Sequence, residues 1–187
     1  MNEQVDDDLI RQAFEGDREA FGMLVERYQK PVYNIALRIL HDEADAEDAA
    51  QTTFIRAFER LSTFDPNQKF FSWLYRIAVN ESINLLKQQN RFERFEGGAG
   101  ENVPDSGTEE REANIEAESR EQQLLDGLME LRVDQRVVIV LKHFQGLSYE
   151  EIGQILGIPE RTVKSRLFTA RTVLKNVLVK RGIGRHD

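Results

Sequence analysis

The chain has 187 residues, of which 40% are hydrophobic and 31% charged, and its formal net charge is −8 at pH 7. It contains no Cys, which excludes a disulfide framework, a thiolate metal site and a cysteine nucleophile, and its three His do not cluster at metal-ligand spacing. The N-terminus is acidic and polar, unlike a signal peptide, and no apolar run approaches the ~20 residues of a membrane span. We therefore expect a soluble cytoplasmic protein without membrane insertion.

The charge is distributed unevenly along the chain. Residues 1–90 carry 10 basic and 16 acidic side chains, and residues 91–120 carry 4 and 9. Residues 158–187, by contrast, carry 8 basic and 2 acidic side chains, which is a net charge of +6. A locally basic C-terminal segment on an acidic chain points to a polyanionic partner for that segment alone.

The N-terminal half is predicted to be helical. Apolar residues recur at helical spacing from residue 9 to residue 40, and Gly16-Asp17 divides this stretch into two helices. Pro31 is expected to kink or restart the second of them. Residues 45–61 predict a third helix with acids in its first turn, and residues 70–92 predict a fourth after a loop marked by Asp-Pro-Asn.

The helical pattern vanishes from about residue 91 to residue 119. That segment is rich in Gly, Glu, Ser and Asn and has little to bury, so it is expected to be a flexible acidic linker. Residues 121–146 predict two further helices, with Asp134 as the cap between them. The fold class is therefore all-α, with a domain at 1–90, the linker at 91–119 and a second small helical domain at 120–187.

The stretch LSYEEIGQILGIPERTVKSRLFTARTVL, residues 147–174, predicts a helix-turn-helix. Ser148 and Glu151 have the spacing of a capping box at the start of the first helix. Gly157 is expected to end that helix in the left-handed conformation, and Pro159 suits the first turn of the next one. In this layout the second helix enters the major groove of DNA.

A helical wheel of the second helix separates two faces. An inner face is formed by Val163, Leu167, Ala170 and Leu174. Arg161, Lys164, Ser165 and Phe168 fall on the outer half, with Arg166 and Arg171 on the flanks. The alternative is an amphipathic surface helix whose charges are only solvated. The capping box, the glycine stop, the proline start and the net charge of +6 together favour DNA binding.

Two N-terminal motifs each allow a functional and a structural interpretation. KFFSWLYRIAVN combines aromatic rings with Lys69 and Arg76, as surfaces that stack unpaired bases do, although aromatic residues at helical spacing usually form core. HDEADAED has five carboxylates in eight residues. Hard-metal sites need carboxylates from several elements, so favourable contacts with one helix dipole explain these acids better than metal binding or catalysis.

In order and spacing, DAEDAAQTTFIRAFERL, NQKFFSWLYRIAVN and the C-terminal motif resemble the extracytoplasmic-function (ECF, group IV) sigma factors of bacterial RNA polymerase. The resemblance covers most of both domains and leaves only the linker unmatched. It implies a region-two helical bundle followed by a region-four helix-turn-helix domain. The implied function is to direct core polymerase to stress-type promoters, by recognition of the −35 and −10 elements and by promoter melting.

The resemblance also implies three sets of contact residues. The residues implied to dock on the clamp helices of the largest polymerase subunit are Asp48, Gln51, Thr52, Phe54, Ile55 and Arg56. The residues implied to recognise the −10 element are Ser62, Phe64, Asp65, Asn67, Lys69, Phe71, Trp73, Tyr75, Arg76 and Asn80. Within this set, Arg76, Asn80 and the loop are the candidates for holding a base flipped from the non-template strand. The residues implied to contact the −35 element are Arg161, Thr162, Lys164, Ser165, Arg166, Phe168 and Arg171.

The implied partners are promoter DNA, core polymerase and an anti-sigma factor. On the polymerase, the contacts are the clamp helices and the flap of the second-largest subunit. The anti-sigma factor would mask the binding faces and sequester the chain at the inner membrane. The sequence departs from the family pattern at Thr52-Thr53 and at Glu160-Arg161. Because of the second departure, the resemblance does not determine which −35 DNA sequence the chain recognises.

Two other functions are weighed against this one. A stand-alone helix-turn-helix regulator with an N-terminal dimerisation or sensing domain would have no use for a surface that binds melted DNA. A helical carboxylate metallohydrolase is disfavoured by the missing His and Cys constellations and by an acid cluster confined to one helix start. We therefore expect no enzymatic activity, no metal and no cofactor.

Overall fold

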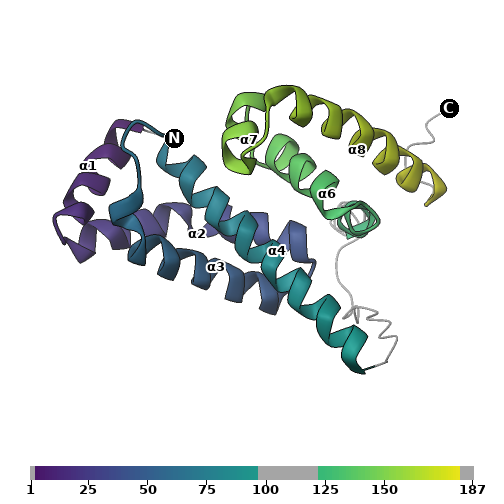
Figure 1. Ribbon diagram of the computed structural model, residues 1–187, viewed down its shortest axis with the longest axis horizontal. Helices are drawn as coiled ribbons and strands as arrows, with labels where there is room; N and C mark the ends of the chain where they lie inside the picture. The colour runs from purple at the N-terminus through teal and green to yellow at the C-terminus, as the bar shows by residue number, and fades with distance from the viewer. Residues whose placement is uncertain (1–2, 97–121, 182–187) are drawn as a thin grey trace, which may run out of the picture.

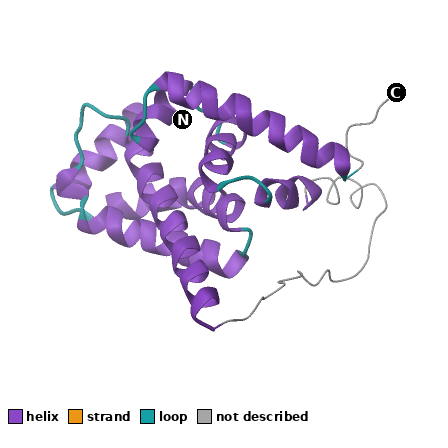
Figure 2. Ribbon diagram, turned by 45° about the vertical axis from the view of Figure 1, so that its right-hand side comes forward, coloured by secondary structure: helices purple, strands orange, loops and turns teal. Residues whose placement is uncertain are grey.

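The computed structural model describes residues 3–96 and 122–181. Within these two ranges the secondary structure is helical, with short connecting loops and no strand (Figure 2). The helices form two groups, an N-terminal bundle and a smaller C-terminal unit, which lie side by side along α4 (Figure 1). The all-α prediction is confirmed.

The N-terminal bundle consists of α1 (Glu3–Phe14), α2 (Arg18–Leu40), α3 (Glu43–Glu59) and α4 (Phe70–Glu96). The first two helices are separated where the sequence predicted, and Asp17 caps α2 by accepting hydrogen bonds from the amides of Glu19 and Ala20. The central helix α2 packs against the other three and buries Leu24, Tyr28 and Ile35. This packing gives the bundle its apolar core.

Two sequence-based boundaries in this bundle need correction. Pro31 does not restart α2, which is continuous from Arg18 to Leu40, because the packing of the helix on three neighbours outweighs the hydrogen bond that proline cannot donate. The last helix, α4, continues to Glu96 and so takes in residues 91–96 of the expected linker. Residues 91–96 contain neither Gly nor Pro, and the first glycine of the expected linker is Gly97. The rest of the expected linker lies outside the described residues.

The C-terminal unit begins with a helix at 122–129, followed by α6 (Val133–Ile139), a π-helical segment (Val140–Phe144), α7 (Tyr149–Leu156) and α8 (Glu160–Lys180). Leu128, Leu141 and Leu167, from three different elements of this unit, are almost fully buried. Asp134 does not cap α6, because Arg132 occupies the N-cap position without a side-chain hydrogen bond. Asp134 instead lies in the first turn of α6, where its charge suits the helix dipole and where it pairs with Arg132.

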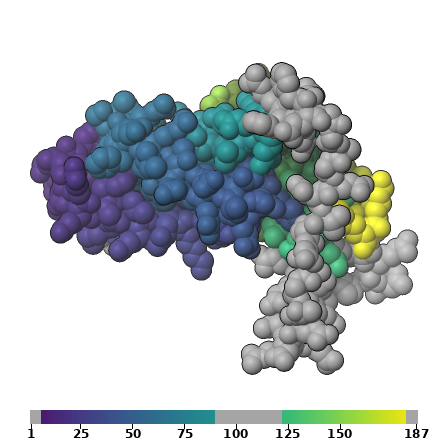
Figure 3. Space-filling model, turned by 90° about the horizontal axis from the view of Figure 1, so that it is seen from below, coloured from purple at the N-terminus to yellow at the C-terminus, as the bar shows by residue number. Residues whose placement is uncertain are grey.

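The two units share one continuous hydrophobic core. Helix α4 packs on α7, and α2 packs on α6 and the π-helical segment. The Arg38 guanidinium lies 4.4 Å from the centre of the Phe144 ring, and His41 Nε2 lies 3.1 Å from Asp126 Oδ1. Seen from below, the teal surface of α4 borders the green surface of the C-terminal unit (Figure 3). The structure therefore holds the two units in direct contact.

Candidate nucleic-acid interface

The turn between α7 and α8 has the geometry that the sequence predicted. Ser148 Oγ accepts a hydrogen bond from the Glu151 amide at 3.2 Å, and a Glu151 carboxylate oxygen accepts one from the Ser148 amide at 2.8 Å. This capping box starts α7, and Gly157 ends it in the left-handed conformation at φ 65°. Pro159 lies one residue before α8, at its N-cap. The helix-turn-helix is confirmed.

The outer face of α8 is open to solvent. Val163, Leu167 and Ala170 are fully buried, as the helical wheel predicted. Phe168 points the other way and is 75% exposed. The other exposed members of the predicted −35 set are Arg161, Lys164, Ser165 and Arg171, whereas Thr162 and Arg166 are half-buried.

Several cations of this surface already have partners within the chain. Lys164 Nζ lies 2.6 Å from Glu160 Oε1, and this pairing raises the pKa of Lys164. Arg171 Nε donates a hydrogen bond to His143 Nε2 at 3.2 Å. Burial, and then the positive charges of Arg171 and Lys142, lower the pKa of His143. His143 is therefore neutral near pH 7 and can accept that bond, which positions Arg171 at the edge of the face.

The predicted polymerase-docking residues lie along α3. Ile55 and Phe58 form an exposed apolar pair, with exposed fractions of 53% and 50%. Asp48 and Gln51 are exposed one to two turns earlier, and Thr52, Phe54 and Arg56 are half-buried. A cavity of about 500 Å³ between α3 and α4 is lined by four members of this set, Asp48, Gln51, Thr52 and Arg56.

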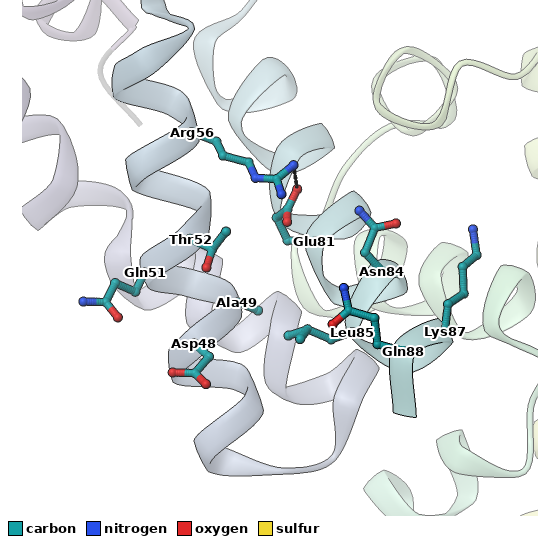
Figure 4. Close-up of a pocket in the computed structure, with 10 residues that line it drawn as sticks. All are labelled: Asp48, Ala49, Gln51, Thr52, Arg56, Glu81, Asn84, Leu85, Lys87 and Gln88. Atoms are coloured by element: carbon teal, nitrogen blue, oxygen red, sulfur yellow. Dashed lines mark ion pairs between the residues drawn. The ribbon is translucent and has the colours of Figure 1, made fainter. Parts of the chain in front are cut away.

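Glu81 is a member of this site that the sequence reading missed. Arg56 reaches across from α3 to the Glu81 carboxylate on α4, at 2.8 Å (Figure 4). Glu81 is largely buried, so the pair joins the two helices and fixes the position of the Arg56 head group. A single acid within the apolar stripe of the fourth helix was the signal that could have indicated it.

The predicted −10 residues divide into buried and exposed groups. Phe64, Phe71 and Tyr75 belong to the core, where burial raises the pKa of Tyr75 to about 12, and Trp73 is half-buried with its ring 5.4 Å from that of Phe64. The rings of Phe64, Phe71 and Tyr75 are thus packed in the core of this structure, whereas Trp73 keeps part of its surface exposed. The exposed members are Ser62, Asp65, Asn67, Lys69, Arg76 and Asn80.

The loop between the short 3₁₀ helix Leu61–Thr63 and α4 is held in shape by Asp65. Asp65 Oδ1 accepts hydrogen bonds from the backbone amide and from the side-chain Nδ2 of Asn67, each at 2.9 Å. The Gln68 amide donates to the Asp65 carbonyl at 2.9 Å. Asp65 therefore positions the loop through its own turn, and the exposed side chains after it are presented on a defined backbone.

Neither a metal site nor a membrane span is found in the part of the chain that the structure describes. Within 3–96 and 122–181, no three His, Asp or Glu side chains gather closely enough to hold a metal ion. In the same ranges, no helix combines the length and the apolar character needed to cross a bilayer.

Asp42 of the acidic motif caps α3, accepting a hydrogen bond from the Asp45 amide at 2.9 Å.

Comparison with known protein families shows to which family this chain belongs. The sigma-70 region 2 model matches residues 24–92, and the sigma-70 region 4 model matches residues 121–174. The chain belongs to the sigma-70 family. The RNA polymerase sigma-H factor of Pseudomonas aeruginosa is 32% identical over 95% of this chain and 96% of its own length. The ECF RNA polymerase sigma-E factor of Haemophilus influenzae is 35% identical over 94% of this chain and 97% of its own.

A solved structure agrees with this assignment. The sigma factor RpoE of Bartonella quintana, in complex with the anti-sigma factor NepR, superposes with a TM-score of 0.70 at 25% identity, covering 84% of this chain and 96% of that one. The chain is thus an ECF sigma factor, and sigma factors are non-enzymatic transcription initiation factors. Its N-terminal bundle corresponds to region 2 and its C-terminal unit to region 4.

Two predicted −10 cations of region 2 contact region 4 in this structure. Lys69 Nζ lies 3.1 Å from Glu151 Oε1, the acid of the α7 capping box. Arg76 Nε donates to the Ile155 carbonyl at 3.2 Å, and its Nη2 donates to the Gln154 carbonyl. These carbonyls belong to the last turn of α7, where the helix dipole favours a cation. In this conformation the sigma factor therefore uses these cations to hold its own two regions together.

Proposed function

We propose that three surfaces of this sigma factor divide the work of promoter recognition. The exposed face of α3 docks on the clamp helices of the largest polymerase subunit. The loop at 62–69 and the start of α4 recognise the −10 element in its melted form, and α8 reads the −35 element of stress-type promoters. The single observation that carries this proposal is the outer face of α8, where a 75% exposed aromatic ring lies among exposed cations on a recognition helix.

The docking role of α3 rests on its exposed apolar residues. Ile55 and Phe58 leave about half of their surface in water although α3 has a well-buried opposite face. Exposed apolar side chains next to one another, bordered by Asp48, Gln51 and Arg56, suit a partner that buries the centre and pairs with the polar rim. We infer that the clamp helices bury this pair.

Replacing Ile55 by Ala is expected to weaken binding to core polymerase by about tenfold, because the truncation removes an apolar contact at the centre of the docking face. The matched control is Met23→Ala on α2, since Met23 is also 53% exposed but lies outside the proposed face. Fluorescence anisotropy of labelled sigma factor titrated with core polymerase measures both. Equal affinities for the two variants would remove α3 from the docking surface.

Reading of the −35 element requires apolar as well as charged contacts. Phe168 has no role in the core, and an exposed apolar side chain on a recognition helix can contact the methyl group of thymine. Exposed Arg161 and Lys164 lie toward the N-terminal end of α8, the end that meets base edges in this docking mode. We infer that Arg166 and Arg171, on the flanks, contact phosphate and set the position of the helix.

The variant Phe168→Ala is expected to lower holoenzyme affinity for a selected −35 duplex by about tenfold while leaving the free energy of unfolding within ~0.5 kcal/mol of the parent. Duplexes are first selected by the holoenzyme from a randomised pool, and affinity is then measured by gel shift. Val179→Ala is the control, because Val179 is an exposed apolar residue at the other end of the same helix. If both variants bind equally well, Phe168 does not contact the DNA.

An anti-sigma factor is the further partner that we propose. The Bartonella quintana sigma factor, which superposes over most of this chain, is in complex with one. A partner that stabilises the contact of Lys69 and Arg76 with region 4 would keep these cations from DNA. In a cytoplasmic chain, a membrane-anchored partner of this kind would also sequester it at the inner membrane. Capture of the tagged chain from its own host, with identification of the bound protein, tests this step.

The proposed function as a whole is tested by run-off transcription with purified core polymerase on the selected duplexes. We expect transcripts that depend on this chain and start at a fixed distance from the selected elements. The absence of any promoter-specific transcript would overturn the proposal. Tight duplex binding by the isolated chain at physiological salt would instead favour a stand-alone regulator.

A further inference from the structure

The recognition helix α8 begins with the two residues at which region 4 departs from the family pattern. These are Glu160 and Arg161, which directly follow Pro159 at the N-cap. In a helix-turn-helix, the N-terminal residues of the second helix contact base edges in the major groove. The departure therefore lies where the −35 sequence is read, and these two side chains help to decide which sequence that is.

Arg161 lies at the centre of the outer face of α8. At roughly 100° per residue it falls within about 40° of Ser165 and about 20° of Phe168, and all three are exposed. The buried side chains Val163 and Leu167 lie on the other side of the helix. Arg161 thus shares one face with the aromatic ring that we expect to contact thymine.

The guanidinium of Arg161 is available to an external partner. Within residues 3–96 and 122–181 its side chain makes no hydrogen bond and no ion pair, whereas Arg166 of the same helix lies 3.8 Å from a carboxylate oxygen of Asp134. The nearby cavity between α4 and the turn before α8 is lined by Arg76 and Glu160 but not by Arg161, which is exposed to solvent. All five N–H donors of Arg161 are therefore free to meet acceptors on DNA.

Lys164, the other cation near the start of α8, is directed elsewhere. Its Nζ lies 2.6 Å from Glu160 Oε1 and 5.5 Å from the centre of the Tyr149 ring on α7. On the helical wheel, Glu160 and Lys164 form a second stripe, about 60–100° from Arg161, on the side of α7. Glu160 thus holds Lys164 toward α7, and Arg161 is the cation that remains at the N-terminal end of the outer face.

An arginine presented to the major groove distinguishes guanine from the other bases. Guanine offers two acceptors there, O6 and N7, which match two parallel N–H donors of a guanidinium. Adenine offers N7 beside an amino group, so one of the two donors would meet another donor. Thymine and cytosine each lack a second acceptor at that edge.

We propose that Arg161 is a specificity-determining residue that reads one guanine of the −35 element through its O6 and N7 atoms. The proposal rests on the −35 role proposed above for α8. It adds one guanine·cytosine preference to the contacts that the rest of the helix makes, at the end of the site that the start of α8 meets.

The test uses holoenzyme assembled from the full chain and core polymerase, with the duplexes that this holoenzyme selects from the randomised pool. Each guanine of the −35 segment is replaced, one position at a time, by 7-deazaguanine. This analogue pairs with cytosine as guanine does but has a carbon atom in place of N7, so it lacks one of the two acceptors. Gel shift measures the affinity for each duplex.

We expect one position at which 7-deazaguanine lowers the affinity of the parent by about tenfold, the usual loss for a hydrogen bond to a charged group. At that position Arg161→Ala should bind the guanine duplex about tenfold more weakly than the parent and should no longer distinguish guanine from the analogue. Each protein is compared on two duplexes, so a smaller folded fraction lowers both affinities alike and cannot imitate this result.

Lys164→Ala is the matched control, because Lys164 is also an exposed cation near the start of α8 but is paired with Glu160. It should keep the full difference between guanine and 7-deazaguanine at that position, even where its overall affinity falls.

Two results would overturn the inference while leaving the proposed function intact. The first is that Arg161→Ala and the parent show the same effect of 7-deazaguanine at every position. A uniform loss of affinity in that variant, with a weaker dependence on salt, would then assign Arg161 to phosphate. The second is that Lys164→Ala loses the discrimination as fully as Arg161→Ala does. If the parent holoenzyme selects no −35 sequence at all, the proposed function itself fails.

Discussion

Replacement of Gly153 by Ala is expected to destabilise region 4 by up to about 2 kcal/mol and to lower −35 binding by at least tenfold. A Cβ at Gly153 would lie 2.8 Å from the Ile158 carbonyl oxygen, closer than real Cβ atoms approach another atom. That carbonyl is backbone, and it belongs to the turn that sets α7 against α8. Overpacking of this kind costs ~1–3 kcal/mol, which outweighs the ~1 kcal/mol by which Ala is preferred within a helix.

The effect on DNA binding follows from the position of the clash. Relief of the contact requires the turn at 157–159 to move away from α7, and α8 begins directly after it at Glu160. The start of α8 is the end that would meet base edges, so a shift of the turn misplaces Arg161 and Lys164 together.

Gly22 supplies the matched control for Gly153. It also lies inside a helix, but a Cβ there would have no atom within 4 Å. Gly22→Ala is therefore expected to stabilise the chain by up to about 1 kcal/mol. Chemical denaturation measures both free energies of unfolding, and gel shift of the holoenzyme measures −35 affinity. Stabilisation of the Gly153 variant to the same extent would contradict the close approach of α7 to the turn.

Replacement of Arg136 by Met is expected to lower the free energy of unfolding by about 3–5 kcal/mol. Arg136 is 4% exposed, and its guanidinium donates to the carbonyls of Leu128, Met129 and Leu131 in region 4 and of Ile39 in region 2. Burial lowers its pKa to about 10, so it remains charged at neutral pH. Met fills similar space but leaves these carbonyls without their donors in the protein interior.

The control for Arg136 is Arg132→Met at the start of the same helix. The Arg132 side chain is 79% exposed and, within residues 3–96 and 122–181, its one ion pair is with Asp134, at 3.3 Å, so its loss should cost less than about 1 kcal/mol. Urea denaturation monitored by the single Trp, Trp73, and by far-ultraviolet circular dichroism distinguishes the two. Similar free energies for both variants would mean that the buried guanidinium does not hold the carbonyls together.

The helix-turn-helix could be predicted because its signals are local. The Ser148–Glu151 box and the Gly157 stop act within one helical turn, and the wheel of α8 depends only on the 3.6-residue period. The same locality explains two of the errors. Pro31 and Asp134 have strong local preferences, but α2 packs on three helices and continues through Pro31, and α6 begins at Val133 and so places Asp134 in its first turn.

Aromatic residues show where sequence periodicity stops being informative. The motif KFFSWLYRIAVN predicted both a core and a base-binding surface, because periodicity identifies a helix face but not what covers it. The structure buries Phe71 and Tyr75 against neighbouring rings and leaves Phe168, on another helix, exposed. Burial is a property of the assembled bundle, so only the tertiary structure could separate these cases.

The sequence by itself determined the helical class, the two-part organisation, the basic recognition helix and the family to which the chain belongs. These depend on short-range spacing and on the order of motifs, which can be recognised in the sequence without any knowledge of packing. Only the tertiary structure decided that Lys69 pairs with the first turn of α7, that Arg76 binds carbonyls of its last turn, and that Glu81 anchors Arg56. Each of these joins residues from different helices, and such pairings arise only when the helices pack.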